Sequence, residues 1–359
     1  MTHSQRRDNL CRLLEVAELD AMLVTDLVNV RYLTGFTGSN AALLVHADGR
    51  ATLATDGRYR TQAATQAPGV GLEIERSCAP ALMRLATAEG LARLGFESDV
   101  VTVDGYDQLA GAADGVELVR AAGTVEALRE VKDDGEKALL RLACEAADAA
   151  LADLIQRGGL APGRTERQVA RDLETLMVDR GADGVSFETI VATGPNSAIP
   201  HHRPTDAELA SGDFVKIDFG ALVAGYHSDM TRTFVLGRAA QWQRDIYGLV
   251  AAAQHAGRDA LAPGAECKDV DAAARTVIAE AGYAENFGHG LGHGVGLQIH
   301  EAPAIGATSA GTLQLGSVVT VEPGVYLPTR GGVRIEDTLI VGEDAPELLT
   351  RFPKELAII

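Results

Sequence analysis

The stretch KIDFGALVAGYHSDMTRT, residues 216–233, predicts a β-hairpin that carries one carboxylate on each arm. If the arms pair symmetrically about a turn centred on Val223 and Ala224, Asp218 lies directly opposite Asp229. Side chains that face each other in this way have Cβ atoms roughly 4.5–5.5 Å apart. Two carboxylates at that separation repel each other, and a cation between them is the natural resolution. The hairpin therefore predicts a cation site in a β-rich region.

A second hairpin with the same property is expected in VVTVEPGVYLPTRGGVRIEDTLIV, residues 318–341. A turn centred near Thr329 would set Glu322 opposite Glu336. Its expected turn residues are Pro328, Gly331 and Gly332. Either carboxylate pair alone is most simply explained as a solvated face, but two such pairs beside a histidine-rich segment favour a common metal site.

That histidine-rich segment is HGLGHGVGLQIHE, residues 289–301. Its glycines do not fit the dinucleotide-binding fingerprint, because the third small residue that the spacing requires would fall on Val295 or Leu297. Glycines at alternate positions in a strand instead allow another backbone or a ligand to approach closely. They leave room for His293 to project into a site.

Four carboxylates and one imidazole form an oxygen-rich ligand set with a total charge near −4, which two divalent cations would neutralise. Such ligands suit Mn²⁺, Co²⁺ or Fe²⁺, and Zn²⁺ is also compatible. Two metal ions about 3.5–4 Å apart would share a bridging hydroxide and polarise a carbonyl group. The ligand set therefore predicts a hydrolase.

Composition excludes several other classes of protein. A formal net charge of −18, without a dense run of Lys or Arg, disfavours binding to nucleic acid or to an anionic membrane. No apolar run reaches the roughly 18 residues of a membrane span, and the first residues alternate apolar and polar side chains, unlike a secretory signal. The four cysteines are scattered without a CxxC pair, which suits free thiols. We therefore expect a cytoplasmic enzyme.

The 359 residues exceed what one core usually fills, so two domains are expected. Strand-like runs at 20–25, 41–47 and 51–56 alternate with helical stretches at 4–19, 57–67 and 80–93, which predicts an α/β domain over residues 1–125. In residues 126–359 the predicted order is a helix pair, strands, a second helix pair and strands, a loose internal duplication. The expected helices are 134–157, 165–181, 239–261 and 267–281, and the expected strands lie within 187–194 and 214–237. Thr165 and Gln168 have the spacing of a capping box.

Seven motifs, in order along nearly the whole chain, resemble one family. They are NVRYLTGFTGSN (29–40), DGRYRTQA (56–63), IVATGPNSAIPHH (190–202), KIDFGALVAGYHSDMTRTF (216–234), HGLGHGVGLQIHEAP (289–303), VEPGVY (321–326) and GGVRIEDT (331–338). The chain resembles the pita-bread metallopeptidases, specifically the Xaa-Pro branch that contains aminopeptidase P and prolidase. The resemblance implies a creatinase/prolidase-like α/β domain over 1–125, followed by a catalytic α+β pita-bread domain of two pseudo-twofold halves over 126–359.

The resemblance also assigns roles to residues. The implied ligands of two divalent metal ions, most simply Mn²⁺, are Asp218, Asp229, His293, Glu322 and Glu336, with Asp229 and Glu336 bridging. Glu322 would also accept the proton of the attacking water. His201 and His300 match the two histidines that act on the reacting carbonyl group, and Arg334 matches the arginine that orients the carboxylates. Tyr326 would line the substrate pocket.

Other histidines are expected to have lesser roles. His202 would point away from His201 in an extended segment, and His227 would oppose the metal face. His289, four residues before His293, is a candidate support for the site. The motifs of the first domain are interpreted as structural, although the resemblance allows part of that domain to cap a substrate pocket across a homodimer.

The main open question is the length of the peptide substrate. A dipeptidase needs a positive group for the free carboxylate of proline, and Ala304 stands where some prolidases carry an arginine. Its absence favours an aminopeptidase that acts on Xaa-Pro at peptide N-termini, with prolidase as the alternative and another basic side chain as a possible substitute. A peptide-binding module without catalysis is a distant alternative, since all five ligand positions are filled. Creatinase-like and methionine aminopeptidase activities are disfavoured.

Overall fold

The computed structural model describes residues 1–359 and divides into two compact units, Met1–Arg129 and Glu130–Ile359. The boundary predicted at residue 125 falls inside helix α6 (Thr124–Glu130). No helix has the length and apolar character needed to span a membrane.

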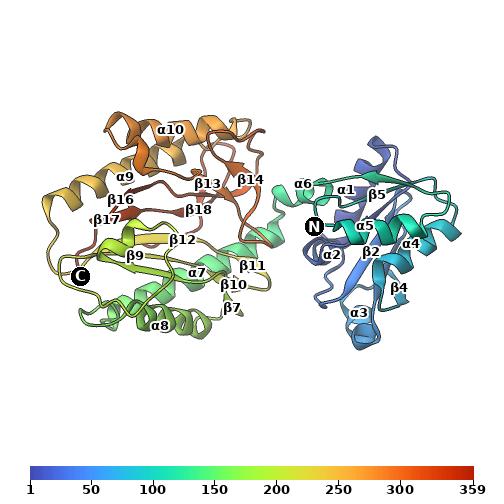
Figure 1. Ribbon diagram of the computed structural model, residues 1–359, viewed down its shortest axis with the longest axis horizontal. Helices are drawn as coiled ribbons and strands as arrows, with labels where there is room; N and C mark the ends of the chain where they lie inside the picture. Colours follow the sequence, from blue (N-terminus) through green and yellow to red (C-terminus); the bar gives the residue numbers. More distant parts are fainter. The chain divides into compact units, whose positions relative to one another are not determined.

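The first unit is built on a six-stranded sheet with the order β4-β3-β2-β1-β5-β6 (Figure 1). Its strands are β1 Ala21–Val24, β2 Ala41–His46, β3 Ala51–Thr55, β4 Gly71–Ile74, β5 Arg93–Phe96 and β6 Glu117–Arg120. Its helices before α6 are α1 His3–Val16, α2 Leu27–Thr34, α3 Arg60–Gln66, α4 Cys78–Ala88 and α5 Val103–Ala112, with a 3₁₀ turn η1 at Gly57–Tyr59. The predicted α/β architecture of this unit is confirmed.

Two details of the first unit differ from the prediction. The helix expected over 80–93 ends at Ala88, because Gly90 adopts a φ of 72° and the chain then enters β5. Helix α2 was not predicted, although the sequence contains its signals. The Asp26 side chain accepts a hydrogen bond from the backbone N–H of Val28, and Gly35 ends the helix at a φ of 82°.

The second unit begins with the helix pair α7 (Asp134–Gln156) and α8 (Glu166–Asp179), which packs on a three-stranded sheet of order β12-β9-β8. These strands are β8 Ile190–Thr193, β9 Phe214–Phe219 and β12 Met230–Val235, with the 3₁₀ turn η2 at Gly194–Ala198. A small sheet joins β7 Gly184–Val185, β10 Ala221–Val223 and β11 Tyr226–His227. The capping box between Thr165 and Gln168 is confirmed at the start of α8.

A second helix pair, α9 (Gln241–Asp259) and α10 (Cys267–Glu280), packs on the remaining strands and forms a separate core. These strands form a five-stranded sheet of order β14-β13-β15-β18-β19 and the hairpin β16–β17. They are β13 Gly292–Gly294, β14 Glu301–Ile305, β15 Val318–Val321, β16 Gly324–Leu327, β17 Gly331–Arg334, β18 Asp337–Ile340 and β19 Glu347–Leu348, preceded by the 3₁₀ turn η3 at Ala284–Asn286. The strands lie between the two helix pairs (Figure 1). The predicted α+β pita-bread fold with two halves is thus confirmed.

The register predicted for the first hairpin is wrong by two residues. Asp218 lies opposite Thr231, and the turn is centred on Ala224 and Gly225. A two-residue hairpin turn of this kind needs a positive φ at both central positions, and these residues have φ values of 47° and 82°. Because side chains alternate with a period of two, the shift leaves Asp218 and Asp229 on the same face.

The register predicted for the second hairpin agrees with the structure. Gly324 pairs with Arg334 in β16–β17, and Val321 pairs with Asp337 in β15–β18. Continuing this register through the residues between the two ladders sets Glu322 opposite Glu336, as predicted. The turn itself consists of residues 328–330, so the two glycines expected in it belong to β17 instead. At Gly332, a Cβ atom would lie 2.6 Å from the carbonyl oxygen of Ser197, which explains that glycine as a close approach.

Candidate metal centre

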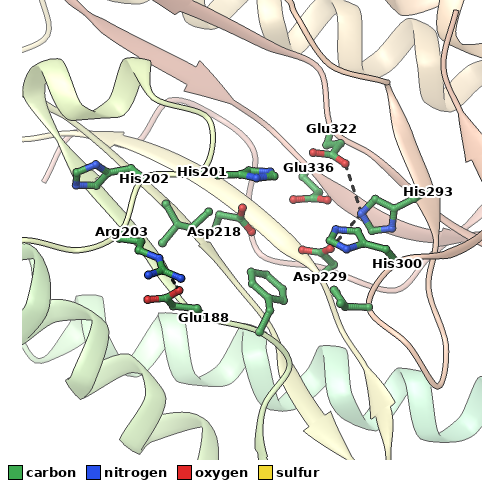
Figure 2. Close-up of a pocket in the computed structure, with 13 residues that line it drawn as sticks. Glu188, His201, His202, Arg203, Asp218, Asp229, His293, His300, Glu322 and Glu336 are labelled. Carbon is green, nitrogen blue, oxygen red and sulfur yellow. Dashed lines mark ion pairs between the residues drawn. The ribbon is translucent and has the colours of Figure 1, made fainter. Parts of the chain in front are cut away.

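A cavity of about 300 Å³ lies where the two halves of the second unit meet (Figure 2). It is lined by Phe187, Glu188, Ile190, His201, His202, Arg203, Asp218, Asp229, His293, Ile299, His300, Glu322 and Glu336. The structure therefore brings together the five predicted metal ligands and the two predicted catalytic histidines. Arg334 and Tyr326 are not among the lining residues.

The glycines of the histidine-rich segment allow His293 to reach this cavity. A Cβ atom on Gly292 would lie 2.0 Å from the carbonyl oxygen of Thr320, and one on Gly294 would lie 2.1 Å from that of Ala302. No side chain fits at these distances, so β13 packs directly against β15 on one side and β14 on the other. The close backbone approach expected from the alternating glycines is present.

The ligand atoms of Asp229, His293 and Glu336 all lie within 4.8 Å of one another. His293 Nε2 is 3.5 Å from Asp229 Oδ2 and 3.5 Å from Glu322 Oε1, so Glu322 borders the same group. Asp218 joins it from β9 and points into the cavity (Figure 2). The cluster thus draws its residues from strands and strand ends of both halves.

The electrostatics of this cluster suit a bound cation. Burial raises the pKa values of Asp229 and Glu336 well above the usual range, and the neighbouring carboxylates add to the effect. Burial also raises the pKa of Glu322 to about 8 and lowers that of His293 to about 4. Asp218 Oδ1 is buried without a hydrogen-bond partner. A buried carboxylate oxygen that accepts no hydrogen bond and lies near three other carboxylates is a suitable ligand for a divalent cation.

Arg334 supports these carboxylates from behind the cavity wall. Its side chain is buried and donates to Asp218, and its Nε lies 3.9 Å from Glu322 Oε2. Nε also donates to Thr231 Oγ1 at 3.0 Å, and that hydroxyl donates to Glu336 Oε2 at 2.7 Å. Thr231, which the sequence did not single out, therefore links the arginine to a third carboxylate. Its position opposite Asp218 would have revealed it if the register had been known.

Tyr326 was predicted to line the substrate pocket, but it lies behind the cavity. Its hydroxyl accepts a hydrogen bond from Arg334 Nη1 and lies 2.9 Å from His289 Nε2. Burial raises the pKa of Tyr326 to about 12, so it remains a neutral partner. His289 extends this chain of contacts toward Arg334, as its candidate supporting role requires.

The two predicted catalytic histidines enter the cavity from opposite sides of the ligand cluster (Figure 2). The rings of His293 and His300 are nearly perpendicular, with centroids 4.4 Å apart, and burial lowers the pKa of His300. The ring of His202 points in the opposite direction from that of His201, as expected (Figure 2). His227 contacts Ser186 outside the cavity.

Sequence reasoning missed the remainder of the cavity wall. Phe187, Ile190 and Ile299 supply apolar surface. Arg203 and Glu188 form an ion pair at the wall, with Arg203 Nε 3.0 Å from Glu188 Oε2 (Figure 2). The only signal for Arg203 was its place two residues after His201.

Comparisons with known proteins agree with this geometry. A family model described as metallopeptidase family M24 matches residues 138–343, and one described as the creatinase/prolidase N-terminal domain matches residues 6–131. A structure described as Xaa-Pro dipeptidase from Bacillus anthracis superposes with a TM-score of 0.94 and 38% identity, covering 99% of this chain and 100% of that chain. X-Pro aminopeptidase from Thermotoga maritima superposes with a TM-score of 0.91 and 32% identity, covering 98% and 99%.

A curated relative, the Xaa-Pro dipeptidase of Pyrococcus horikoshii, is 40% identical over 268 residues, which are 75% of this chain and 76% of the relative. The resemblance inferred from the seven motifs is therefore confirmed, and with it the hydrolase class. The chain belongs to metallopeptidase family M24 and carries a creatinase/prolidase N-terminal domain before its catalytic domain.

Proposed function

We propose that this protein is an Xaa-Pro dipeptidase that uses divalent metal ions to hydrolyse the bond before proline in a free dipeptide. The sequence favoured an aminopeptidase because Ala304 left no evident receptor for a terminal carboxylate. Two kinds of evidence support the dipeptidase instead. The relatives named above include two Xaa-Pro dipeptidases, one of which matches the chain over almost its full length. The second is the composition of the cavity wall.

Arg203 is the single Arg or Lys among the thirteen residues that line the cavity, and this observation carries the proposal. The other charged residues there are acidic, so a substrate carboxylate has one cationic partner available. Arg203 and Glu188 have side chains that are 83% and 61% exposed, and an exposed ion pair contributes little free energy. The arginine can therefore exchange Glu188 for the carboxylate of a substrate. Ala304 is not among the lining residues, so the positive charge at the cavity comes from Arg203 and does not depend on position 304.

The size and lining of the cavity also suit a short peptide. A volume of about 300 Å³ lies at the lower end of the range for ligand pockets. Its apolar wall offers a surface for the proline ring. The bond before proline is a tertiary amide without an N–H, so a site that recognises the ring loses nothing by lacking an acceptor for that group.

The residues around the cluster have complementary roles in hydrolysis. Divalent ions held by Asp218, Asp229, His293, Glu322 and Glu336 would supply Lewis-acid catalysis. Glu322 accepts the proton of the attacking water and returns it to the departing proline nitrogen. His201 and His300 donate hydrogen bonds to the carbonyl oxygen as negative charge develops on it. Arg334 donates to Asp218 and lies beside Glu322, so it fixes the orientation of both carboxylates.

The test compares kcat/KM for Ala-Pro, Ala-Pro amide and Ala-Pro-Ala at a fixed metal concentration. A dipeptidase should prefer Ala-Pro, and Arg203→Gln should reduce the ratio of Ala-Pro to Ala-Pro amide by about 10- to 100-fold, the value of a charge-assisted hydrogen bond. Arg141→Gln is the matched control, because Arg141 forms an exposed ion pair with Glu347 outside the cavity. Faster cleavage of Ala-Pro-Ala would instead support the second candidate, an Xaa-Pro aminopeptidase, which the likeness to the Thermotoga maritima enzyme favours.

A further inference from the structure

Both histidines predicted to act on the substrate carbonyl are followed by a residue that is held from outside the cavity. His202, after His201, contacts Glu166 at the start of α8. Glu301, after His300, contacts Lys132 near the start of the second unit. Glu166 and Lys132 are not among the residues that line the cavity. Neither position was singled out by the sequence.

Glu166 is fully buried and binds a single segment of the chain with both carboxylate oxygens. Oε1 accepts from the backbone N–H of Thr193 and from Asn196 Nδ2, both at 2.9 Å. Oε2 lies 2.8 Å from His202 Nε2 and accepts from the backbone N–H and the hydroxyl of Thr205 at 2.8 and 2.7 Å. All five contacts go to residues on either side of His201. The carboxylate therefore ties both ends of the His201 segment to α8.

The middle of that segment is fixed separately. The carbonyl oxygen of Pro200 accepts from Lys216 Nζ at 3.1 Å and from Arg334 Nη1 at 3.2 Å. His201 is therefore enclosed between a clamped residue before it and a clamped residue after it. The rings of His201 and His202 point in opposite directions (Figure 2), so the contact that holds His202 against Glu166 also fixes the backbone from which His201 enters the cavity.

Lys132 holds the residue after His300 through an ion pair in which the outside partner is the cation and the residue after the histidine is the carboxylate. Its Nζ lies 2.6 Å from Glu301 Oε1, and the two side chains are 1% and 4% exposed. Glu301 Oε2 also accepts from the backbone N–H of Gln298 at 3.3 Å, within the loop that carries His300. A Cβ atom on Gly296 would lie 2.3 Å from Glu301 Oε1, so the glycine makes room for the carboxylate. The pair thus fixes the loop on both sides of His300.

We propose that Glu166 and Lys132 are positioning residues, which set the directions of His201 and His300 at the substrate carbonyl oxygen. The proposal rests on the peptidase function given above. Hydrogen bonds to a developing oxyanion require donors about 2.7–3.1 Å from it, and a misplacement of about 1 Å can cost about 10²-fold in rate. A buried charge paired at short range suits this task, because a single geometry satisfies it.

The first test separates turnover from binding. Glu166→Gln and Lys132→Met should each lower kcat for Ala-Pro by about 10- to 100-fold, with KM within about threefold and metal content unchanged. Lys132→Arg should recover most of the loss because it keeps the charge. Glu174→Gln on α8 and Lys137→Met on α7 are the matched controls, and they should retain wild-type kcat. A wild-type kcat in both anchor variants would overturn the proposal.

The decisive test is a pair of double-mutant cycles. If Glu166 acts through His201, Glu166→Gln should cost little further in a His201→Ala background but its full effect in a His300→Ala background. Lys132→Met should give the reverse pattern. Equal losses in both backgrounds would show general damage and overturn the proposal. His202→Gln keeps Glu166 and should repeat the Glu166 pattern, so the result does not depend on one variant that folds poorly.

These cycles also separate this proposal from the proposed function. They are measured with whichever Xaa-Pro peptide the wild-type protein cleaves best, so a preference for tripeptides leaves them intact. A wild-type protein that cleaves no Xaa-Pro peptide would contradict the proposed function before any variant is compared.

Discussion

Thr231 lies directly opposite Asp218 and passes a hydrogen bond from Arg334 to Glu336. The orientation of the cavity carboxylates thus depends on side chains that do not touch the cavity. Arg334 is buried among them, and losing it would leave several anionic groups without a counter-charge. At the scale of single residues, the carboxylates that line the cavity are held by a second group of side chains behind them. Arg334 and Thr231 each contact more than one member of the site.

Glu322 combines two roles at one carboxylate, since it borders His293 and is the proposed acceptor of the water proton. Glu322→Gln should lower kcat for the preferred peptide by at least 10²–10⁴-fold, the usual worth of a general base. The measurement needs metal analysis of the same sample, because the variant also loses a proposed ligand. Retention of a tenth of the wild-type kcat would show that another group takes the proton.

At the scale of elements, the glycines of β13 decide how closely three strands pack around His293. The same strand packs against β14 and β15, and the cavity lies at its His293 side chain. Only a residue without a Cβ allows this spacing at Gly292 and Gly294. The glycine pattern of the sequence is therefore a packing requirement that serves the site.

Gly294→Ala tests this packing. The added Cβ would lie 2.1 Å from the carbonyl oxygen of Ala302, so the variant should lose about 1–3 kcal/mol or more of its free energy of unfolding. It should also lower kcat because His293 shifts with the strand. Gly288→Ala is the control, since its Cβ would meet no atom within 4 Å. Equal stability of the two variants in urea unfolding would contradict the packing argument.

At the scale of the whole molecule, the sequence predicted an architecture of one α/β unit and one α+β unit. The structure places seven of the predicted site residues around one cavity. Motifs succeeded where the chemistry is local, as in the Glu322–Glu336 hairpin, whose register was correct. The register of the Asp218 hairpin failed because the turn is decided by which residues tolerate a positive φ, not by symmetry. The sequence did not reveal the roles of Arg203, Glu166 and Lys132, because their partners lie far along the chain or in another element.

The division into two units predicts how metal binding and folding are coupled. All proposed ligands lie in Glu130–Ile359, and the first unit has its own core, so metal should stabilise only the second unit. At a metal concentration 100 times Kd, the gain in the free energy of unfolding is about 2.7 kcal/mol.

The single tryptophan, Trp242, packs on Phe214 in the second unit, so its fluorescence reports that unit alone. Removing metal with a chelator should lower the midpoint of the Trp242 transition on heating, whereas circular dichroism should retain a component, from the first unit, that does not move. A Trp242 transition unchanged by Mn²⁺, Co²⁺ or Zn²⁺ would contradict the metal site, and an equal shift of every component would show that the two units unfold as one.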